Sequence, residues 1–455
     1  MENRNEADLK SSPLYIQIYI HYKGLIATGK LKPGSKLPSI RKCALERMIS
    51  KTTVEAAYLQ LSAEGYIISK PGSGFYVCDI NYDNIQKPIK KKYKKIAPKK
   101  KPLYDFVSYS VDSKSFDFDL WSRYIKSALR SRERLLYYGD AQGEYDLRLA
   151  IAHYVSEHRG VICEPEQIVV GAGVQSLLNI LCSLTTISSP VVFTGVDFVK
   201  GRVVFRDRGF KTVFYKNLAS DLSGFENINP KIIYTSPSHT TPWGDVMPIN
   251  TRLALLSYAK SHKCLIIEDD FDSEFRYYVR PVPSLQSLDG GQNVIYMGTF
   301  SRLLLPSVRI SFMVLPIGLI DEYEKVGEDY NQTASITEQI ALCQFIRDGH
   351  LNKIIKKARK LYITKSNMFC ACVKNVFKDK AEAIPSLGGF LIQLEVKTDE
   401  TSGELVKKAA NAGVLVKPLD LNGQGDYPRI LLCLSGVPEE DFEEALNLLK
   451  NEFLK

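Results

Sequence analysis

The stretch GTFSRLLLPSVR, residues 298–309, decides how most of this chain is interpreted. An apolar, β-branched run precedes it at residues 294–297, and a second apolar run follows at residues 310–315. Runs of this length and composition are typical of buried strands, and the polar residues between them indicate a loop. The sequence therefore predicts a strand, a loop with Arg302 near its centre, and a second strand.

Length and composition place the chain among soluble proteins with more than one domain. At 455 residues, with 45% hydrophobic and 24% charged residues, it exceeds what one hydrophobic core normally organises. No apolar run approaches the ~20 residues of a membrane span, and the N-terminus is polar. The nine cysteines are scattered without the spacing of a metal site. We therefore expect a cytoplasmic protein with reduced thiols, no metal and no membrane partner.

Residues 80–102 are predicted to link two domains. The part from Lys87 to Lys101 holds nine lysines and no acidic residue, and without it the formal net charge of +9 falls to zero. It lacks helical or alternating apolar periodicity, which predicts an extended segment. Two interpretations stay open: a solubilising tether, or an arm whose lysines add salt-dependent phosphate contacts to bound DNA.

Residues 1–79 show the pattern of a small helical domain. From Pro13, apolar residues at positions 14, 18, 22, 25 and 26 follow the spacing of an amphipathic helix that stops near Gly29. Ser39 and Ser50 are placed to cap two further helices. The last helix carries an apolar face that we expect to be buried, formed by Val54, Ala57, Tyr58 and Leu61. The short step between these helices is that of a helix-turn-helix, so residues 51–53 begin a recognition helix.

A hairpin with a basic, Gly-rich turn follows, with strands at residues 66–69 and 74–77. The motifs PLYIQI (13–18), LPSIR (37–41), TVEAAY (53–58) and AEGYI (63–67) resemble the winged helix of the GntR superfamily. Arg47 departs from that pattern, because the family usually has an apolar residue there. The alternative, a helical module that only bundles, explains neither the hairpin nor its basic turn. The resemblance implies binding to double-stranded DNA through Arg41, Ser50, Lys51, Thr52, Thr53, Lys70, Gly72 and Ser73.

From residue 103 to 455 the chain alternates apolar, β-rich runs with segments of helix length. The runs at 168–170, 191–193, 232–234, 265–267 and 294–297 predict an α/β domain with a parallel, helix-covered sheet and a site at the strand ends. Gly171, Ala172 and Gly173 follow the first run and open a helix. Backbone N–H groups at such a helix start form a cradle for phosphate.

The loop at 298–309 resembles the cofactor-lysine loop G-T-F-S-K-x-L-x-P-x-x-R of MocR-type regulators, whose large domain is a fold-type-I aminotransferase-like domain. The resemblance implies pyridoxal 5′-phosphate (PLP) as cofactor, with the lysine forming an imine to its aldehyde. In this chain Arg302 occupies the lysine position. A guanidinium stays protonated and offers no nucleophilic nitrogen. We therefore expect no catalytic residue here, and PLP held noncovalently at best or not at all.

The stretch EDDFDSEFRY at 268–277 resembles the family motif EDDYDSEFRY. The resemblance implies that Asp269 pairs with the pyridinium nitrogen, and that Phe271 replaces a tyrosine that bonds the cofactor's phenolic oxygen. A buried acid at a strand end needs a cationic partner. Arg429 begins a late strand and is of the type that clamps an effector carboxylate, the alternative being a surface arginine. The residues that the resemblance assigns to the cofactor are Gly171, Ala172, Gly173, Phe198, Asp269, Ser301, Arg302, Arg309 and, reaching across a dimer, Tyr138.

Three functions compete for this chain. A DNA-binding regulator whose large domain forms a head-to-tail homodimer and senses a small molecule explains both halves of the sequence. Its effector would be noncovalent PLP, a PLP–amino acid adduct or another anion. A working aminotransferase would need a lysine that this loop does not supply. A DNA-binding dimer with a ligand-free scaffold would leave Asp269 and Arg309 with little use beyond pairing with each other.

Overall fold

A computed structural model describes residues 12–80, 101–108, 110–185, 190–196, 198–216, 222–275, 282–386, 390–419 and 426–455. The chain divides into two compact units, residues 1–99 and 100–455, and each is described by itself. Most of the predicted linker, and residues 276–277 of the acidic motif, lie outside the described residues. The domain boundaries at 79 and 103 stay predictions.

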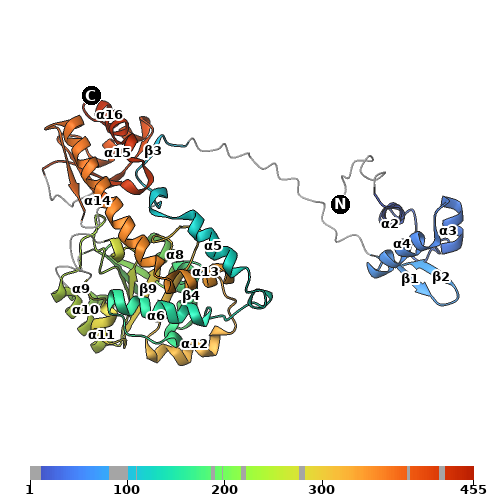
Figure 1. Ribbon diagram of the computed structural model, residues 1–455. Coiled ribbons are helices and arrows are strands. Elements are labelled where there is room, and N and C mark those ends of the chain that lie inside the picture. The colour runs from blue at the N-terminus through green and yellow to red at the C-terminus, as the bar shows by residue number, and fades with distance from the viewer. Residues whose placement is uncertain are drawn as a thin grey trace. The chain divides into compact units, whose positions relative to one another are not determined.

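The first unit is a winged helix (Figure 1). Its elements are α2 (Leu14–Ala27), α3 (Ile40–Arg47), α4 (Lys51–Ala63), β1 (Ile67–Lys70) and β2 (Gly74–Val77). Both predicted caps are present, since Ser39 Oγ accepts from the Lys42 N–H at 3.2 Å and Ser50 Oγ accepts from the Thr53 N–H at 3.1 Å. β1 and β2 form an antiparallel hairpin. The predicted order of three helices followed by a wing is confirmed.

The core of this unit is the predicted apolar face of α4. Val54, Ala57, Tyr58 and Leu61 are fully buried. They belong to one cluster with Ile18, Tyr22 and Ile26 of α2. The Tyr58 hydroxyl donates to the Pro38 carbonyl at 3.0 Å and so ties α4 to the turn before α3. Arg47 stays exposed at the end of α3, with its guanidinium 5.8 Å from the ring centre of Tyr22. α3 therefore packs without burying this charge.

The second unit is built on a seven-stranded sheet with the strand order β4-β10-β9-β8-β7-β5-β6. The strands are β4 (Ile168–Gly171), β5 (Val191–Thr194), β6 (Thr212–Tyr215), β7 (Ile232–Thr235), β8 (Leu265–Asp270), β9 (Val294–Thr299) and β10 (Ser311–Val314). The sequence predicts a parallel sheet, but β10 runs antiparallel to both β9 and β4. The reason is the connection after β9, which has no helix to carry the chain back and so returns it in the opposite direction.

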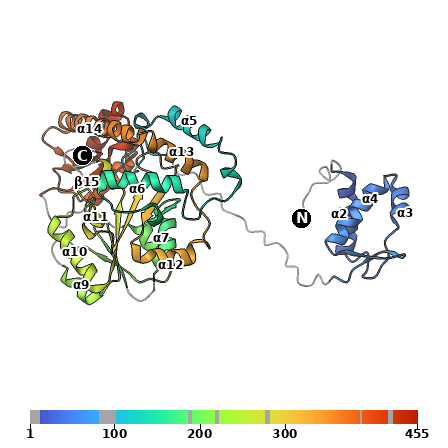
Figure 2. The same cartoon turned by 60° about the horizontal axis from the view of Figure 1, so that its bottom comes forward.

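Helices cover both faces of this sheet (Figure 2). They are α5 (Phe118–Ala128), α6 (Tyr145–Arg159), α7 (Val174–Ser183), α8 (Val199–Asp207), α9 (Ser223–Ile228), α10 (Ile249–His262), α11 (Leu285–Asp289), α12 (Ile320–Gly327) and α13 (Ile336–Arg347). Side chains of α7, α8 and α12 pack on one face, and those of α6, α10, α11 and α13 on the other. The α/β class predicted from the alternating runs is confirmed.

A C-terminal lobe completes the unit, and the sequence predicts only one of its strands. The long helix α14 (His350–Phe377) runs between the large sheet and this lobe (Figure 1). The lobe contains β11 (Ala381–Pro385), β12 (Leu391–Val396), α15 (Ser402–Asn411), β13 (Val414–Leu415), β14 (Lys417–Leu419), β15 (Arg429–Cys433) and α16 (Phe442–Phe453). The short strand β3 (Tyr104–Asp105), which follows the linker, pairs in parallel with β13. None of the described helices has the length and apolar character to span a membrane.

Candidate functional site

The loop after β9 carries three predicted site residues, Ser301, Arg302 and Arg309, and brings Arg309 to the end of β4. Its base is closed by a hydrogen bond from the Phe300 N–H to the Ile310 carbonyl at 2.9 Å, and Thr299 Oγ1 and Ser311 Oγ lie 2.8 Å apart. Arg309 has φ +53°, in the left-handed region that side chains other than glycine rarely adopt. The closed loop therefore holds Arg309 in a strained conformation, which is common at binding sites.

Arg309 lies against the Gly-rich turn between β4 and α7. It donates from Nη2 to the Ala172 carbonyl at 3.1 Å, and a Cβ on Gly173 would lie 2.5 Å from the same nitrogen. Only glycine, which also has φ +95° here, permits this approach. The buried Ser301 hydroxyl has no hydrogen-bond partner among the described residues. The Arg309 guanidinium therefore lies at the start of the ten-residue helix α7, and a helix start attracts negative charge.

Asp269 lies at the end of β8, buried, and accepts a hydrogen bond on Oδ2 from the Tyr234 hydroxyl at 2.5 Å. The sequence predicts a cationic partner for this acid, but its hydrogen-bond partner is a neutral phenol. Burial raises the pKa of Asp269 to about 7, and the hydrogen bond from Tyr234 opposes that rise. The other oxygen, Oδ1, is buried without a hydrogen-bond partner in the described part of the chain.

Phe198 packs against Tyr234, the residue whose hydroxyl donates to Asp269. The two rings stack with centroids 5.7 Å apart and an interplanar angle of 25°. Phe198 in turn leaves no room for a side chain at Gly201, because a Cβ there would lie 2.4 Å from its ring. Phe198 therefore stacks on the same tyrosine that donates to the buried carboxylate, and its role beside a cofactor ring stays a prediction.

Arg302 lies against one carboxylate and two aromatic rings. Its Nη1 lies 3.4 Å from Oδ2 of Asp272, and its guanidinium lies 5.1 Å from the ring centres of both Phe271 and Phe390. Asp272 also lies 2.6 Å from Nδ1 of His239. Two aromatic rings and a shared carboxylate therefore hold this arginine at the position where the family resemblance places a lysine.

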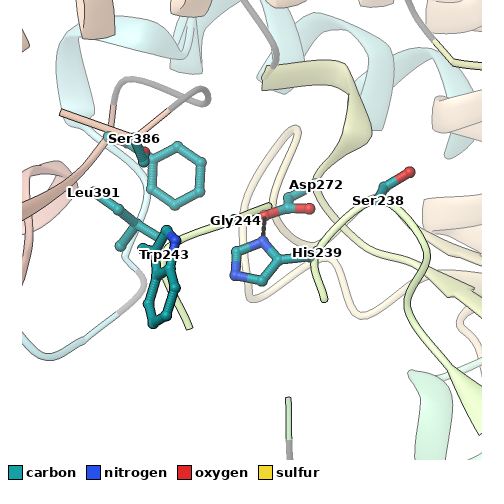
Figure 3. Close-up of a pocket in the computed structure, with 8 residues that line it drawn as sticks. Ser238, His239, Trp243, Gly244, Asp272, Ser386 and Leu391 are labelled. Atoms are coloured by element: carbon teal, nitrogen blue, oxygen red, sulfur yellow. Dashed lines mark hydrogen bonds and ion pairs between the residues drawn. The ribbon is translucent and has the colours of Figure 1, made fainter. Parts of the chain in front are cut away.

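Two small hollows border Phe390. One is lined by Ser238, His239, Trp243, Gly244, Asp272, Ser386, Phe390 and Leu391, and Figure 3 shows the His239 ring between Trp243 and the Asp272 carboxylate. The other is lined by Ser110, Phe275, Arg302, Tyr362, Phe390 and Ser435. Asp272 belongs to the acidic motif at residues 268–277. Ser110, Tyr362 and Phe390 gave no sequence signal, because only the fold brings them to Arg302.

Arg429 begins β15, as the sequence predicts, but its hydrogen-bond partners lie within the C-terminal lobe. Its Nε donates to Glu395 at 2.7 Å and its Nη1 donates to Gln393 at 3.2 Å, both across the β12–β15 pair. A two-point contact of this kind balances the charge of the guanidinium. The role of Arg429 as a contact for an effector carboxylate stays a prediction.

The predicted DNA-binding residues lie at the start of α4, on α3 and at the tip of the wing. Arg41, Ser50, Lys51, Thr52, Lys70, Gly72 and Ser73 are exposed, and Thr53 is half-buried. Gly72 has φ +72°, which the tight turn requires. The Lys70 ammonium lies 4.7 Å from the ring centre of Tyr76, whose hydroxyl lies 2.6 Å from Ser73 Oγ. The wing therefore presents a lysine and an ordered hydroxyl pair to solvent.

Both halves of the chain resemble known proteins. The gntR family of bacterial regulatory proteins matches residues 14–77, and the aminotransferase class I and II family matches residues 108–449. The HTH-type transcriptional regulator YdeL of Bacillus subtilis is 37% identical and covers 96% of each chain. The probable rhizopine catabolism regulatory protein MocR of Rhizobium meliloti is 29% identical over 97% of this chain and 94% of its own. An archaeal alanine:glyoxylate aminotransferase shares the fold, with a TM-score of 0.67 and 20% identity over 77% of this chain and 90% of its own.

Proposed function

This chain belongs to the MocR-type transcriptional regulators of the GntR family, which join a winged helix to an aminotransferase class I and II domain, and we propose that its large domain senses an anionic small molecule instead of catalysing a reaction. The winged helix would bind operator DNA in the cytoplasm. The large domain would dimerise and bind the effector, so that ligand occupancy changes operator binding.

The observation that carries the sensor role is that two buried oxygens, Asp269 Oδ1 and Ser301 Oγ, have no hydrogen-bond partner among the described residues. A buried polar atom without a hydrogen bond is costly, and a ligand that supplied a donor to Asp269 and an acceptor to Ser301 would remove that cost. Asp269 and Arg309 also make separate contacts, with Tyr234 and Ala172, so they are not kept only to pair with each other.

PLP fits one part of this site and not another. Its phosphate would be held by Arg309, Ser301 and the turn at Gly173, and its ring nitrogen by Asp269 beside Phe198. When bound, PLP would supply an aldehyde. Arg302 offers that aldehyde no nucleophilic nitrogen, and Phe271 lacks the hydroxyl that the family resemblance places there. PLP would therefore be held reversibly, which argues against transaminase activity.

For DNA, the support is the exposed start of α4 and the wing. N-terminal residues of a recognition helix reach base edges and phosphates, and Lys51 and Thr52 occupy that position. Lys70 at the wing would add a phosphate contact. We assign base or nearby phosphate contacts to Lys51, Thr52 and Thr53, and backbone contacts to Arg41, Lys70, Gly72 and Ser73.

For the dimer, the support is an exposed apolar loop before α6. Leu136, Tyr137 and Tyr138 are 81%, 76% and 90% exposed, and a run of large apolar side chains in solvent marks a contact surface. Head-to-tail pairing would bury it and bring Tyr138 to the phosphate site of the other subunit. Leu136→Glu should shift sedimentation toward the monomer, whereas Leu454→Glu, at an exposed position directly after the last helix α16, should not.

The sensor role is tested by titrating the full-length protein with PLP while following absorbance and thermal unfolding. We expect saturable, reversible stabilisation without an imine band. Arg309→Gln and Asp269→Asn should each weaken it about tenfold or more, because each removes a charged group that would contact the ligand. Lys408→Gln, which removes a half-buried surface ion pair with Glu400, is the matched control. Stabilisation that is equal in all four proteins would refute this pocket as the PLP site.

A further inference from the structure

Glu55 lies on the outer face of α4, the helix that we assign to the DNA groove. It is exposed and lies one turn beyond Lys51 and Thr52, so it shares their side of the helix. The other side packs into the core of the winged helix through residues such as Val54 and Tyr58. Residues in the first turns of a recognition helix are the ones that reach base edges. A carboxylate therefore belongs to the surface that would contact a polyanion.

The Glu55 carboxylate makes no ion pair and no hydrogen bond within the described part of the chain. Two other acids of the winged helix are paired. Glu64 lies 2.8 Å from the Lys23 ammonium, and Glu46 lies 3.9 Å from the Lys42 ammonium. The Glu55 carboxylate is therefore available to a donor outside this unit.

The polar side chains beside Glu55 differ in whether they already have partners. The Ser50 hydroxyl lies 2.8 Å from the Thr52 hydroxyl and 2.6 Å from the Thr53 hydroxyl. Lys51 is exposed, and a lysine four residues before a glutamate pairs with it only weakly. Lys51 and Glu55 are therefore the two long side chains with which the first two turns of α4 can reach beyond the helix surface.

A carboxylate on a DNA-binding face is selective, because most of the DNA surface repels it. Phosphates repel it, and so do the major-groove acceptors of guanine and thymine. Cytosine instead presents a donor, the N4 amino group. Adenine has a similar donor at N6, but its acceptor N7 lies beside that donor and would repel the second carboxylate oxygen. Cytosine is therefore the base that this side chain favours.

We propose that Glu55 determines part of the sequence specificity, by accepting a hydrogen bond from N4 of a cytosine in the major groove of the operator. This inference rests on the operator binding proposed above and names the base that one position of α4 selects. The wing lysine Lys70 would add affinity for any sequence through a phosphate. Glu55 would lower this general affinity and compensate for the loss only where a cytosine lies opposite it.

The test selects binding sites for the full-length protein from a pool of random duplexes and compares wild type with Glu55→Gln. Wild type should enrich cytosine at one position, and replacing that base should weaken binding about 5- to 100-fold. Glu55→Gln should prefer adenine at the same position, because a glutamine amide matches adenine N6 and N7. The rest of the selected site should stay the same. The variant should also bind random duplexes more tightly, because it has lost one negative charge.

Glu46→Gln is the matched control, since it removes the same charge from an exposed position on the neighbouring helix α3. Both substitutions keep the side-chain length and lie outside the core, and Glu46→Gln should leave the selected sequence unchanged. If Glu55→Gln selects the same bases as wild type, Glu55 reads no base and this inference alone is refuted. If both variants change binding to all duplexes by one factor, Glu55 acts only through net charge and the inference is wrong. Wild-type protein that enriches no sequence would refute the proposed operator binding itself.

Discussion

The guanidinium of Arg302 lies 5.1 Å from the ring centre of Phe271, so the residues that replace the family's cofactor lysine and its tyrosine contact each other. A tyrosine at 271 would carry a hydroxyl toward the cofactor, and a lysine at 302 would carry an amine. Phenylalanine and arginine instead form a cation–π pair, which gains strength away from water. The two departures are therefore physically coupled, and reversing one without the other should give only part of the original chemistry.

Arg302→Lys tests this coupling. With PLP added, we expect an imine absorbance band and a borohydride-stable mass increase on residue 302, because a lysine in this partly buried site has an accessible lone pair. Wild type and Arg302→Gln should show neither. Adding Phe271→Tyr to Arg302→Lys should strengthen the adduct. The single variant Arg302→Lys, which keeps Phe271, should not catalyse transamination. A reducible adduct in the wild-type protein would mean that another lysine reacts, and would contradict our account of this site.

The recognition helix and the linker should contribute to DNA binding in different ways. Lys51→Gln and Thr52→Val should lower affinity most for a duplex selected as a specific site, because these exposed residues begin α4. Replacing lysines between 87 and 101 should weaken binding to specific and random duplexes alike, and each phosphate interaction removed should reduce the salt slope by about one. Binding isotherms at several salt concentrations separate the two effects. Equal weakening on both duplexes for both sets of variants would remove the distinction in roles.

The sequence predicts the winged helix almost completely and the site only in part. Caps such as Ser39 and Ser50 act within three residues of the N–H groups they bind, so local sequence reports them. Asp272, one partner of Arg302, lies thirty positions away in the chain. The contact of Arg302 with the Phe390 ring depends on how the C-terminal lobe packs. Such contacts leave no periodic signal. The same holds for Ser110, which is brought to the hollow beside Arg302 by the pairing of β3 with β13.

Met48, in the turn between α3 and α4, gives a stability prediction for the winged helix. It has φ +54° and ψ +44° and is 95% exposed, so its side chain gains little packing while its backbone adopts the left-handed conformation. That conformation costs a non-glycine residue ~1–2 kcal/mol of folding free energy. Glycine avoids this cost but makes the unfolded chain more flexible, which cancels part of the gain in stability. Met48→Gly should therefore stabilise the domain by about 0.5–1 kcal/mol, measured by amide exchange of α4 in the full-length protein. Met48→Ala, which keeps the Cβ, should give no such gain.

Asp269 should make stability depend on pH in a predictable direction. Its pKa of about 7 in the folded protein lies above its ordinary value, so the folded state binds this proton more tightly than the unfolded state does. The stability that this group contributes is therefore full below the unfolded pKa and is lost as pH rises through about 7. Asp269→Asn removes the titrating group but keeps an acceptor for Tyr234. The melting temperature of the variant relative to wild type should thus increase between pH 5 and pH 8.

Two controls separate this effect from general pH sensitivity. The exposed Glu324→Gln should follow the wild-type curve over the whole range. Glu268→Gln should show the same trend as Asp269→Asn, because burial also raises the pKa of Glu268 to about 7. A ligand that donates to Oδ1 of Asp269 would favour the ionised carboxylate and flatten the wild-type curve, so saturating PLP should reduce the difference between wild type and Asp269→Asn at pH 8. A difference that is constant with pH would show that Asp269 does not titrate here, and that its orphan oxygen is not poised for a ligand donor.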